Sequence, residues 1–261
     1  MPGQFGGTLR PDYVLPFRLS KEDAVRALKE HYKGKILLPK AFTRQNHIEE
    51  IKGVYVPFWL FDGEADADMT FHATNSETHR SGDYIVTRTS HYEVGRSGTI
   101  AFEKVPVDGS SKMPDDFMDS IEPYDYSDLK KFSTAYLPGF LADKYDVDAA
   151  GAAERADTRC RNTAEASVMR TVTGYASVNI RTEDIRLRRG EVKYALLPVW
   201  LLSTRWQDKN YLFAMNGQTG KMVGDLPADK GKLNKWFWGT GIGASLLFIL
   251  LFSGLLSGLF M

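Results

Sequence analysis

Residues 54–69 read VYVPFWLFDGEADADM, and this stretch carries the clearest fold signal in the sequence. Its first half is apolar and aromatic, which is typical of a buried strand. From residue 62 onward, acidic side chains alternate strictly with glycine and alanine, and a period of two places alternate side chains on opposite faces of a strand. The stretch therefore predicts one long strand whose second half carries an acidic row of Asp62, Glu64, Asp66 and Asp68.

The acidic row is the sharpest polar feature of the sequence. Carboxylates on one strand face repel one another unless basic groups or a cation lie beside them. Calcium and magnesium prefer oxygen ligands, but four ligands along a straight strand spread over about 20 Å, which is too far for one ion. We therefore expect no metal site here, and we interpret the row as a solvated face or as a surface that docks a partner.

The rest of the chain predicts an α+β fold. Helical spacing indicates an N-terminal helix over 21–33 and a long mid-chain helix over about 148–172, and runs typical of strands precede and follow the latter. This order favours mainly antiparallel sheets. Residues 1–12 read as an irregular lead-in and 13–229 as one domain. The strings YVPFWL (55–60) and YALLPVWL (194–201) are alike, which either a duplication into two related halves or chance would explain.

The charges are balanced but unevenly placed. The chain of 261 residues has 33 Lys and Arg against 33 Asp and Glu, and none of them lies beyond residue 235. A net charge of zero argues against a generally basic nucleic-acid binder. The single cysteine, Cys160, excludes an intrachain disulfide and a cysteine-based zinc ribbon.

The uncharged end, residues 236–261, predicts a transmembrane helix, because about 20 apolar residues cross a bilayer. Residues 230–235 then form a basic linker, and the positive-inside rule predicts a single-pass protein of the cell membrane with a cytoplasmic domain. The expected membrane-interface residues are Lys230, Lys232, Lys235, Trp236 and Trp238. Helix packing, and with it a homo-oligomer, is one reading of the pairs Gly239/Gly243 and Gly254/Gly258; the other is that glycine is common in membrane helices.

The sequence shows no reactive constellation. His72, His79 and His91 fall in one β region with Asp83, but their spacing matches no metal motif, and we expect surface histidines. Nucleotide, dinucleotide and nucleophile-elbow motifs are absent. The basic segment around Arg186, Arg188 and Arg189 is diluted by acidic neighbours. We therefore expect no catalytic residue, no metal ligand and no cofactor in this chain, and no nucleic-acid partner.

Five strings carry a family resemblance: residues 31–40, 50–68, 105–125, 140–149 and 212–232. They resemble the bacterial TFIIB-type zinc-ribbon-containing membrane proteins (YdjG-like), some of which are described as PriA-like helicases. Members usually carry N-terminal Cys-x-x-Cys zinc ribbons, which this chain lacks, so zinc is expected only in relatives.

The resemblance implies a non-enzymatic, membrane-anchored adaptor for envelope stress. Its implied partners are the lipid bilayer, SPFH (flotillin-like) scaffold proteins and phage-shock-type proteins. A nucleic-acid-associated replication protein remains the alternative, followed by a membrane enzyme with an unrecognised site.

Overall fold

The computed structural model describes residues 9–45 and 48–259, with the side chains of 44, 45, 247 and 250–259 left out. Two short 3-10 turns, Tyr126–Asp128 and Thr134–Tyr136, accompany the main elements. These elements are β1 (Tyr13–Val14), α1 (Lys21–His31), α2 (Lys40–Gln45), β2 (Ile48–Ser81), β3 (Tyr84–Asp108), α3 (Asp115–Ser120), β4 (Lys130–Lys131), β5 (Leu141–Ala142), α4 (Ala149–Met169), β6 (Ser177–Trp206), β7 (Lys209–Asn216), β8 (Met222–Gly224) and α5 (Lys230–Leu259).

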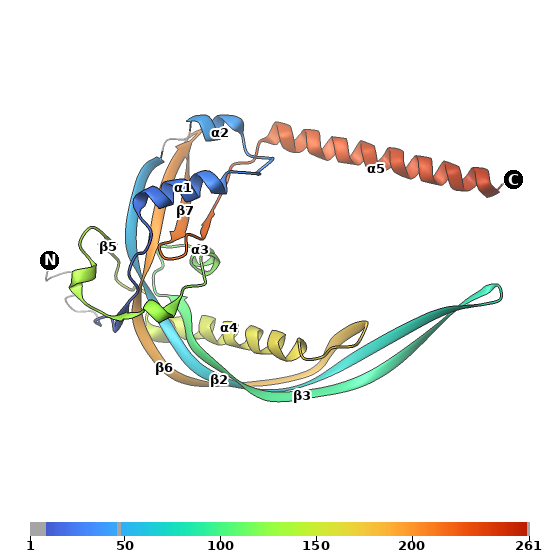
Figure 1. The fold of residues 1–261 in the computed structure, drawn as a ribbon, viewed down its shortest axis with the longest axis horizontal. Coiled ribbons are helices and arrows are strands. Elements are labelled where there is room, and N and C mark those ends of the chain that lie inside the picture. The colour runs from blue at the N-terminus through green and yellow to red at the C-terminus, as the bar shows by residue number, and fades with distance from the viewer. Residues whose placement is uncertain (1–8, 46–47, 260–261) are drawn as a thin grey trace.

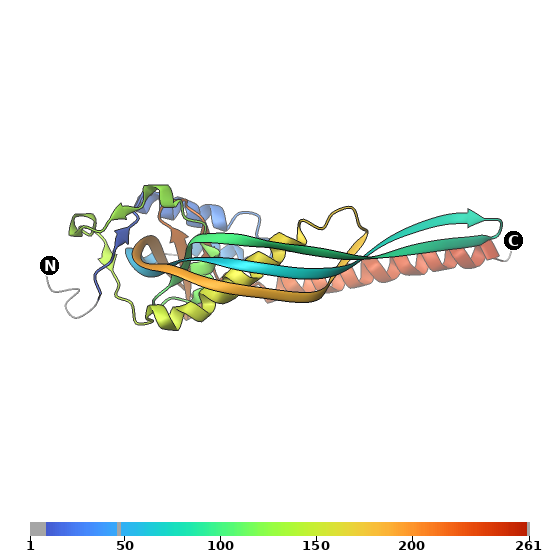
Figure 2. The same cartoon turned by 90° about the horizontal axis from the view of Figure 1, so that it is seen from below.

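Three strands of unusual length organise the molecule. β2, β3 and β6 run through a rounded body and continue out of it as a curved arm, formed by residues 63–102 and 177–189 (Figures 1 and 2). α4 lies along the inner face of this arm, and α5 leaves the body on the other side in the same general direction (Figure 1).

The sheet is one mixed, eight-stranded sheet rather than several antiparallel ones. Its main order is β3-β2-β6-β1-β4. β2 pairs antiparallel with both β3 and β6, whereas β1 with β6 and β2 with β5 are parallel pairs. The expectation of mainly antiparallel sheets therefore missed the short parallel strands, which are too short to leave a periodic signal.

The body core forms around the aromatic strand segments. Trp59 and Trp200 are buried, and each indole N–H donates to a backbone carbonyl: Val147 at 2.9 Å and Leu19 at 3.0 Å. The two similar strings, 55–60 and 194–201, lie on neighbouring strands and pair with each other antiparallel. The helix predicted over 21–33 begins after Ser20 with a complete capping box.

The prediction of a transmembrane helix over 236–261 is wrong. Within the described residues, no helix is long and apolar enough to cross a membrane. α5 begins inside the basic segment, so Lys230, Lys232 and Lys235 lie on its first turns. The predicted localisation as a single-pass protein of the cell membrane depended on this helix and is wrong for the same reason.

Candidate functional site

The arm leaves the body at a double bulge centred on Asp62. Phe61 pairs with Val105 and Gly63 with Phe102, so two residues of β3 lie opposite Asp62 alone. β6 does the same on the other side, where residues 190–191 lie opposite it. Bulges bend and twist the strand that carries them. Two bulges at one level therefore account for the bend between body and arm.

Close backbone contacts stabilise this bend. Asp62 Oδ1 accepts the N–H of Lys104, whose φ is +54°, at 2.7 Å. A Cβ on Gly63 would lie 2.8 Å from the carbonyl oxygen of Arg188, and one on Gly190 would lie 3.0 Å from the carbonyl oxygen of Asp62. Asp62 therefore has a backbone-supporting role that sets it apart from the rest of the predicted acidic row.

α4 braces the arm from its inner face. The helix turns small side chains, among them Ala164 and Val168, onto Ala65, Ala67 and Met69 of β2. All five are buried, and the alanines let helix and strand approach closely. The alternation in residues 62–69 thus has the predicted result, with one face packed under a helix and the other exposed.

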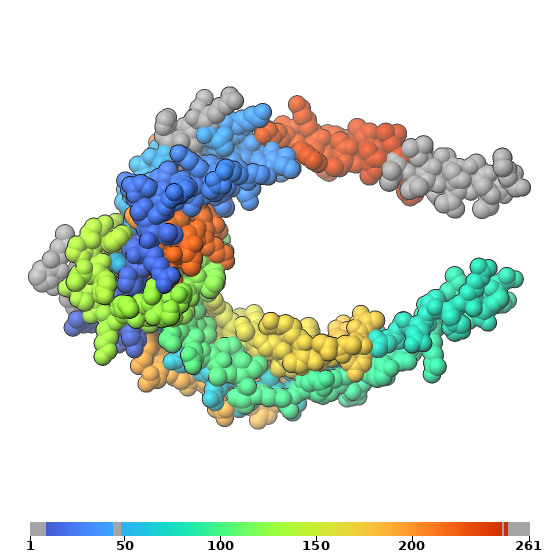
Figure 3. Space-filling view, viewed as in Figure 1, coloured from blue at the N-terminus to red at the C-terminus, as the bar shows by residue number. Residues whose placement is uncertain are grey.

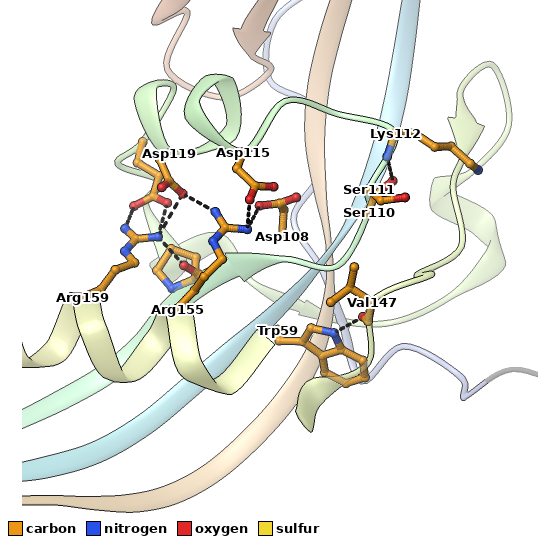
Figure 4. Close-up of polar contacts among 12 residues, drawn as sticks. Trp59, Asp108, Ser110, Ser111, Lys112, Asp115, Asp119, Val147, Arg155 and Arg159 are labelled. Atoms are coloured by element: carbon orange, nitrogen blue, oxygen red, sulfur yellow. Dashed lines mark hydrogen bonds and ion pairs between the residues drawn. The ribbon is translucent and has the colours of Figure 1, made fainter. Parts of the chain in front are cut away.

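An ion-pair network ties the base of α4 to α3 (Figure 4). Arg155 contacts the buried carboxylate of Asp108 at 2.9 Å, Asp115 at 3.1 Å and Asp119 at 3.2 Å. Arg159, one turn further on, binds both carboxylate oxygens of Glu122. Burial raises the pKa of Asp108 and of Glu122, and the guanidinium beside each carboxylate offsets part of that rise.

A cavity of about 300 Å³ lies beside this network. Its lining includes Tyr124, Tyr126, Cys160, Arg159 and Glu122. The charges of Arg159 and Glu122 neutralise each other in an ion pair. Burial raises the pKa of the Cys160 thiol, which keeps it in the unreactive protonated form. Both tyrosine hydroxyls are buried without a hydrogen-bond partner among the described residues.

The far end of the arm is a bare two-stranded hairpin, which we call the tip (residues 75–90). The pairing of β6 with β2 ends at Thr74. Within the described chain, β3 alone pairs with β2 beyond this point, and no strand pairs with the outer edge of β3. Tyr84 and Ile85 are each 77% exposed and Val86 is 41% exposed. The tip therefore presents apolar side chains and two open strand edges, standing well clear of the body (Figure 3).

The sequence is 39% identical over 243 residues to the uncharacterised protein YdjG of Bacillus subtilis (strain 168), across 93% of this chain and 71% of the relative. The chain belongs to the YdjG family. No family model matches it, and neither does any solved structure. The name of the relative states no activity, so the zinc-ribbon description of the family and the absence of catalysis both stay predictions.

In this YdjG-family chain, the rest of the acidic row lies on the outer face of the arm. Arg188 of the neighbouring strand contacts Glu64 at 2.8 Å and Asp66 at 3.2 Å, and Thr99 donates to Asp66 at 2.7 Å. Asp68 lies across from Asp184. The sheet itself thus supplies the basic neighbour that a row of carboxylates requires.

The basic segment of β6 is also internally neutralised. Arg181, Arg186, Arg188, Arg189 and Lys193 each form an ion pair with a carboxylate of this chain. Their partners lie on the arm, on α4 or two residues away on β6, so the positive charges do not gather into a stripe that would follow a phosphate backbone.

Two of the three histidines that the sequence places in this β region lie together. His72 and His91 lie side by side on the outer face of the arm, whereas His79 lies on the tip, across from Val86. Within the described residues, no group of three or more His, Cys, Asp or Glu side chains is placed to hold a metal ion.

The first turns of α5 contact the body. Lys232 donates from Nζ to the carbonyl oxygen of Leu38 at 2.7 Å, and Trp236 lines an apolar hollow with Ile36 and Leu37. Trp238 is exposed and contacts Phe237 edge-on. A Cβ on Gly239 or Gly243 would meet no atom within 4 Å. Of the predicted packing pairs, Gly254 and Gly258 lie outside the described side chains.

Sequence reasoning missed both the double bulge and the arginine network. Asp108 and Arg155 are 47 residues apart, so no local pattern joins them. One signal was available for the bulges: Gly63 and Gly190 each interrupt a run that otherwise reads as a strand, and an isolated glycine in a strand often marks a bulge.

Proposed function

We propose that this chain is a non-enzymatic adaptor that binds a protein partner through the tip of its braced arm. The observation that carries the proposal is the projection of residues 75–90 beyond the last pairing of β6. A two-stranded hairpin is marginally stable alone, and exposed edges with apolar side chains are a site for adding another strand.

The chemistry of the tip favours an extended, partly apolar segment. Backbone N–H and C=O groups along an open edge bind a strand of any sequence, while side chains beside the edge select it. On one face of the tip lie paired hydroxyls, Ser76 with Thr89 at 3.0 Å and Thr78 with Thr87 at 3.1 Å. Tyr84 and Val86 lie on the other face. The partner segment therefore presents apolar residues to the second face, and to the first face polar residues beside the hydroxyls and an apolar one near Ile85, which lies on that face.

The family resemblance supplies the partner class to test. SPFH-type scaffold proteins are the first candidates and phage-shock-type proteins the second, which would place the chain in envelope-stress assemblies. The alternative, a nucleic-acid-associated protein, receives no support from the basic residues of β6, because each forms an ion pair within the chain.

Shortening the tip tests the proposal. Deleting residues 76–81 and 84–89 joins the paired residues Asn75 and Ser90 through the natural turn Gly82–Asp83 and preserves which face each side chain occupies. We expect the shortened chain to keep its fold and to lose capture of a purified SPFH-type scaffold protein from the same bacterium.

The acidic row provides the matched comparison. A variant with Glu64→Gln, Asp66→Asn and Asp68→Asn keeps the tip and removes charge from the outer face of the arm. Capture that survives tip shortening but fails in this variant would move the binding surface to the acidic row and contradict the proposal.

A further inference from the structure

His72 and His91 form a close imidazole pair on the outer face of the arm. His72 Nε2 and His91 Nδ1 lie 3.2 Å apart, the ring centroids are 5.2 Å apart, and the ring planes differ by 29°. Both side chains are exposed. The residues come from neighbouring strands and are offset by two positions from direct pairing, since His72 lies across from Glu93 and His91 across from Thr74.

The nitrogen separation suits two ligands of one metal ion. Zinc binds imidazole nitrogen at about 2.0–2.1 Å, so two such ligands at a tetrahedral angle lie about 3.3 Å apart. A hydrogen bond between two neutral imidazole rings gives a similar nitrogen–nitrogen distance. The metal-free pair and the metal-bound pair therefore differ in whether a proton or a metal ion lies between the two nitrogens. We propose that His72 and His91 bind a divalent transition-metal ion that prefers imidazole, such as Zn²⁺ or Cu²⁺.

The surroundings hold the pair in place and limit its strength. Continuous pairing of β2 with β3 through residues 63–81 fixes the two Cα positions, so little ordering is required on binding. Glu93, which lies across from His72, forms an ion pair with Arg181 at 2.5 Å, so its carboxylate is not a metal ligand in this site. Because the chain supplies two nitrogens, water completes the coordination. The site therefore binds more weakly than a closed four-ligand zinc site, and Cu²⁺ binds more tightly than Zn²⁺.

This site is separate from the tip and from partner capture. Each histidine supplies half of the protein ligands, so removing either one removes the site. His79 is also exposed and lies on β2 of the same hairpin, which makes it a matched control.

Isothermal titration of the full chain with CuCl₂ and with ZnCl₂ tests the proposal. We expect one metal ion bound per chain at neutral pH. His72→Ala and His91→Ala should each abolish binding, while His79→Ala should leave it unchanged. No binding by the wild-type chain, or binding that survives both His72→Ala and His91→Ala, would overturn the proposal. Because both side chains are exposed, we expect the variants to keep their fold, and circular dichroism of each variant checks that the strands are intact.

Discussion

Asp62 Oδ1 accepts the backbone N–H of Lys104 at 2.7 Å, at the level where β3 and β6 both bulge. The contact satisfies a donor that the bulge removes from the strand ladder. Asp62→Ala should therefore destabilise the chain by about 1–3 kcal/mol, the cost of an unsatisfied, partly buried donor. Urea unfolding measures this. Asp66→Ala, on the exposed face, should cost less than about 1 kcal/mol, and an equal cost for the two substitutions would contradict the role given to Asp62.

Gly63 is required by the close approach of β6 to β2. Gly63→Ala places a methyl group 2.8 Å from the carbonyl oxygen of Arg188, and backbone must move to relieve the contact. We expect a loss of about 1–3 kcal/mol in the free energy of unfolding. Gly98→Ala, in open space on β3, should be neutral or slightly stabilising. If thermal unfolding showed the two variants to be alike, the bend would not depend on this contact.

Arg159→Met should destabilise the chain in a pH-dependent way. Glu122 is 15% exposed, and removing its partner leaves a carboxylate buried without compensation, at a cost of about 3–5 kcal/mol at neutral pH. Burial already raises the pKa of Glu122, so the folded chain holds this proton more tightly than the unfolded chain, and stability from this group falls as pH rises through the raised value. Losing Arg159 raises the pKa further.

The cost of Arg159→Met should therefore shrink as pH falls toward the ordinary pKa of a glutamate, because protonation removes the unpaired charge. Urea unfolding of wild type and variant at pH 7.5 and at pH 5 gives the difference at each pH. If the loss in unfolding free energy stayed constant or grew toward pH 5, the unpaired carboxylate of Glu122 would not be the cause of the destabilisation.

The α4 brace can be removed locally. Ala164→Asp puts a charge against the buried face of β2, whereas Ala166→Asp lies on the exposed side of the same helix. Hydrogen exchange should show faster exchange of residues 65–73 in the first variant, with protection of β7 retained, because the arm opens as a unit. The second variant should exchange like the wild type. Uniform loss of protection through the body would contradict an independently braced arm.

Local signals were readable from the sequence where one element determines them. The helix predicted over 21–33 is present as α1, which Ser20 and Asp23 cap, and the alternation after residue 62 correctly separates a packed face from an exposed one. The alternation could not show how far the strand continues. β2 ends only at Ser81, but residues 75–81 have no buried face, so their sequence shows no apolar–polar alternation.

Two prolines show why the pairing could not be read from the sequence. A proline within a strand usually marks an edge or a bulge, yet Pro57 and Pro198 both lie in central strands. On one side of β2, the pairing strand changes from β5 to β3 at Pro57, and on one side of β6 it changes from β1 to β7 at Pro198. Because no strand pairs with the proline on that side, its missing N–H interrupts no row of hydrogen bonds. The paired residues on either side are Tyr55 and Phe58 around Pro57, and Leu196 and Val199 around Pro198.

The candidate sites depend on register, which a single sequence does not fix. His72 and His91 meet because β2 and β3 pair continuously to the turn at Gly82, and a one-residue slip would put them on opposite faces. Arg155 and Arg159 meet their carboxylates through contacts between α4, α3 and β3. The transmembrane prediction is wrong because no helix among the described residues is long and apolar enough to cross a membrane, and α5 also begins six residues before the predicted segment, among the lysines.

Site-specific photo-crosslinking tests partner binding at the tip most directly. A benzoylphenylalanine at position 85, on the tip, is compared with one at position 68, in the acidic row, in the presence of an SPFH-type scaffold protein. Binding through the tip predicts a covalent adduct from position 85 and none from position 68. An adduct from position 68 alone, or from neither position while the two proteins still purify together, would contradict it.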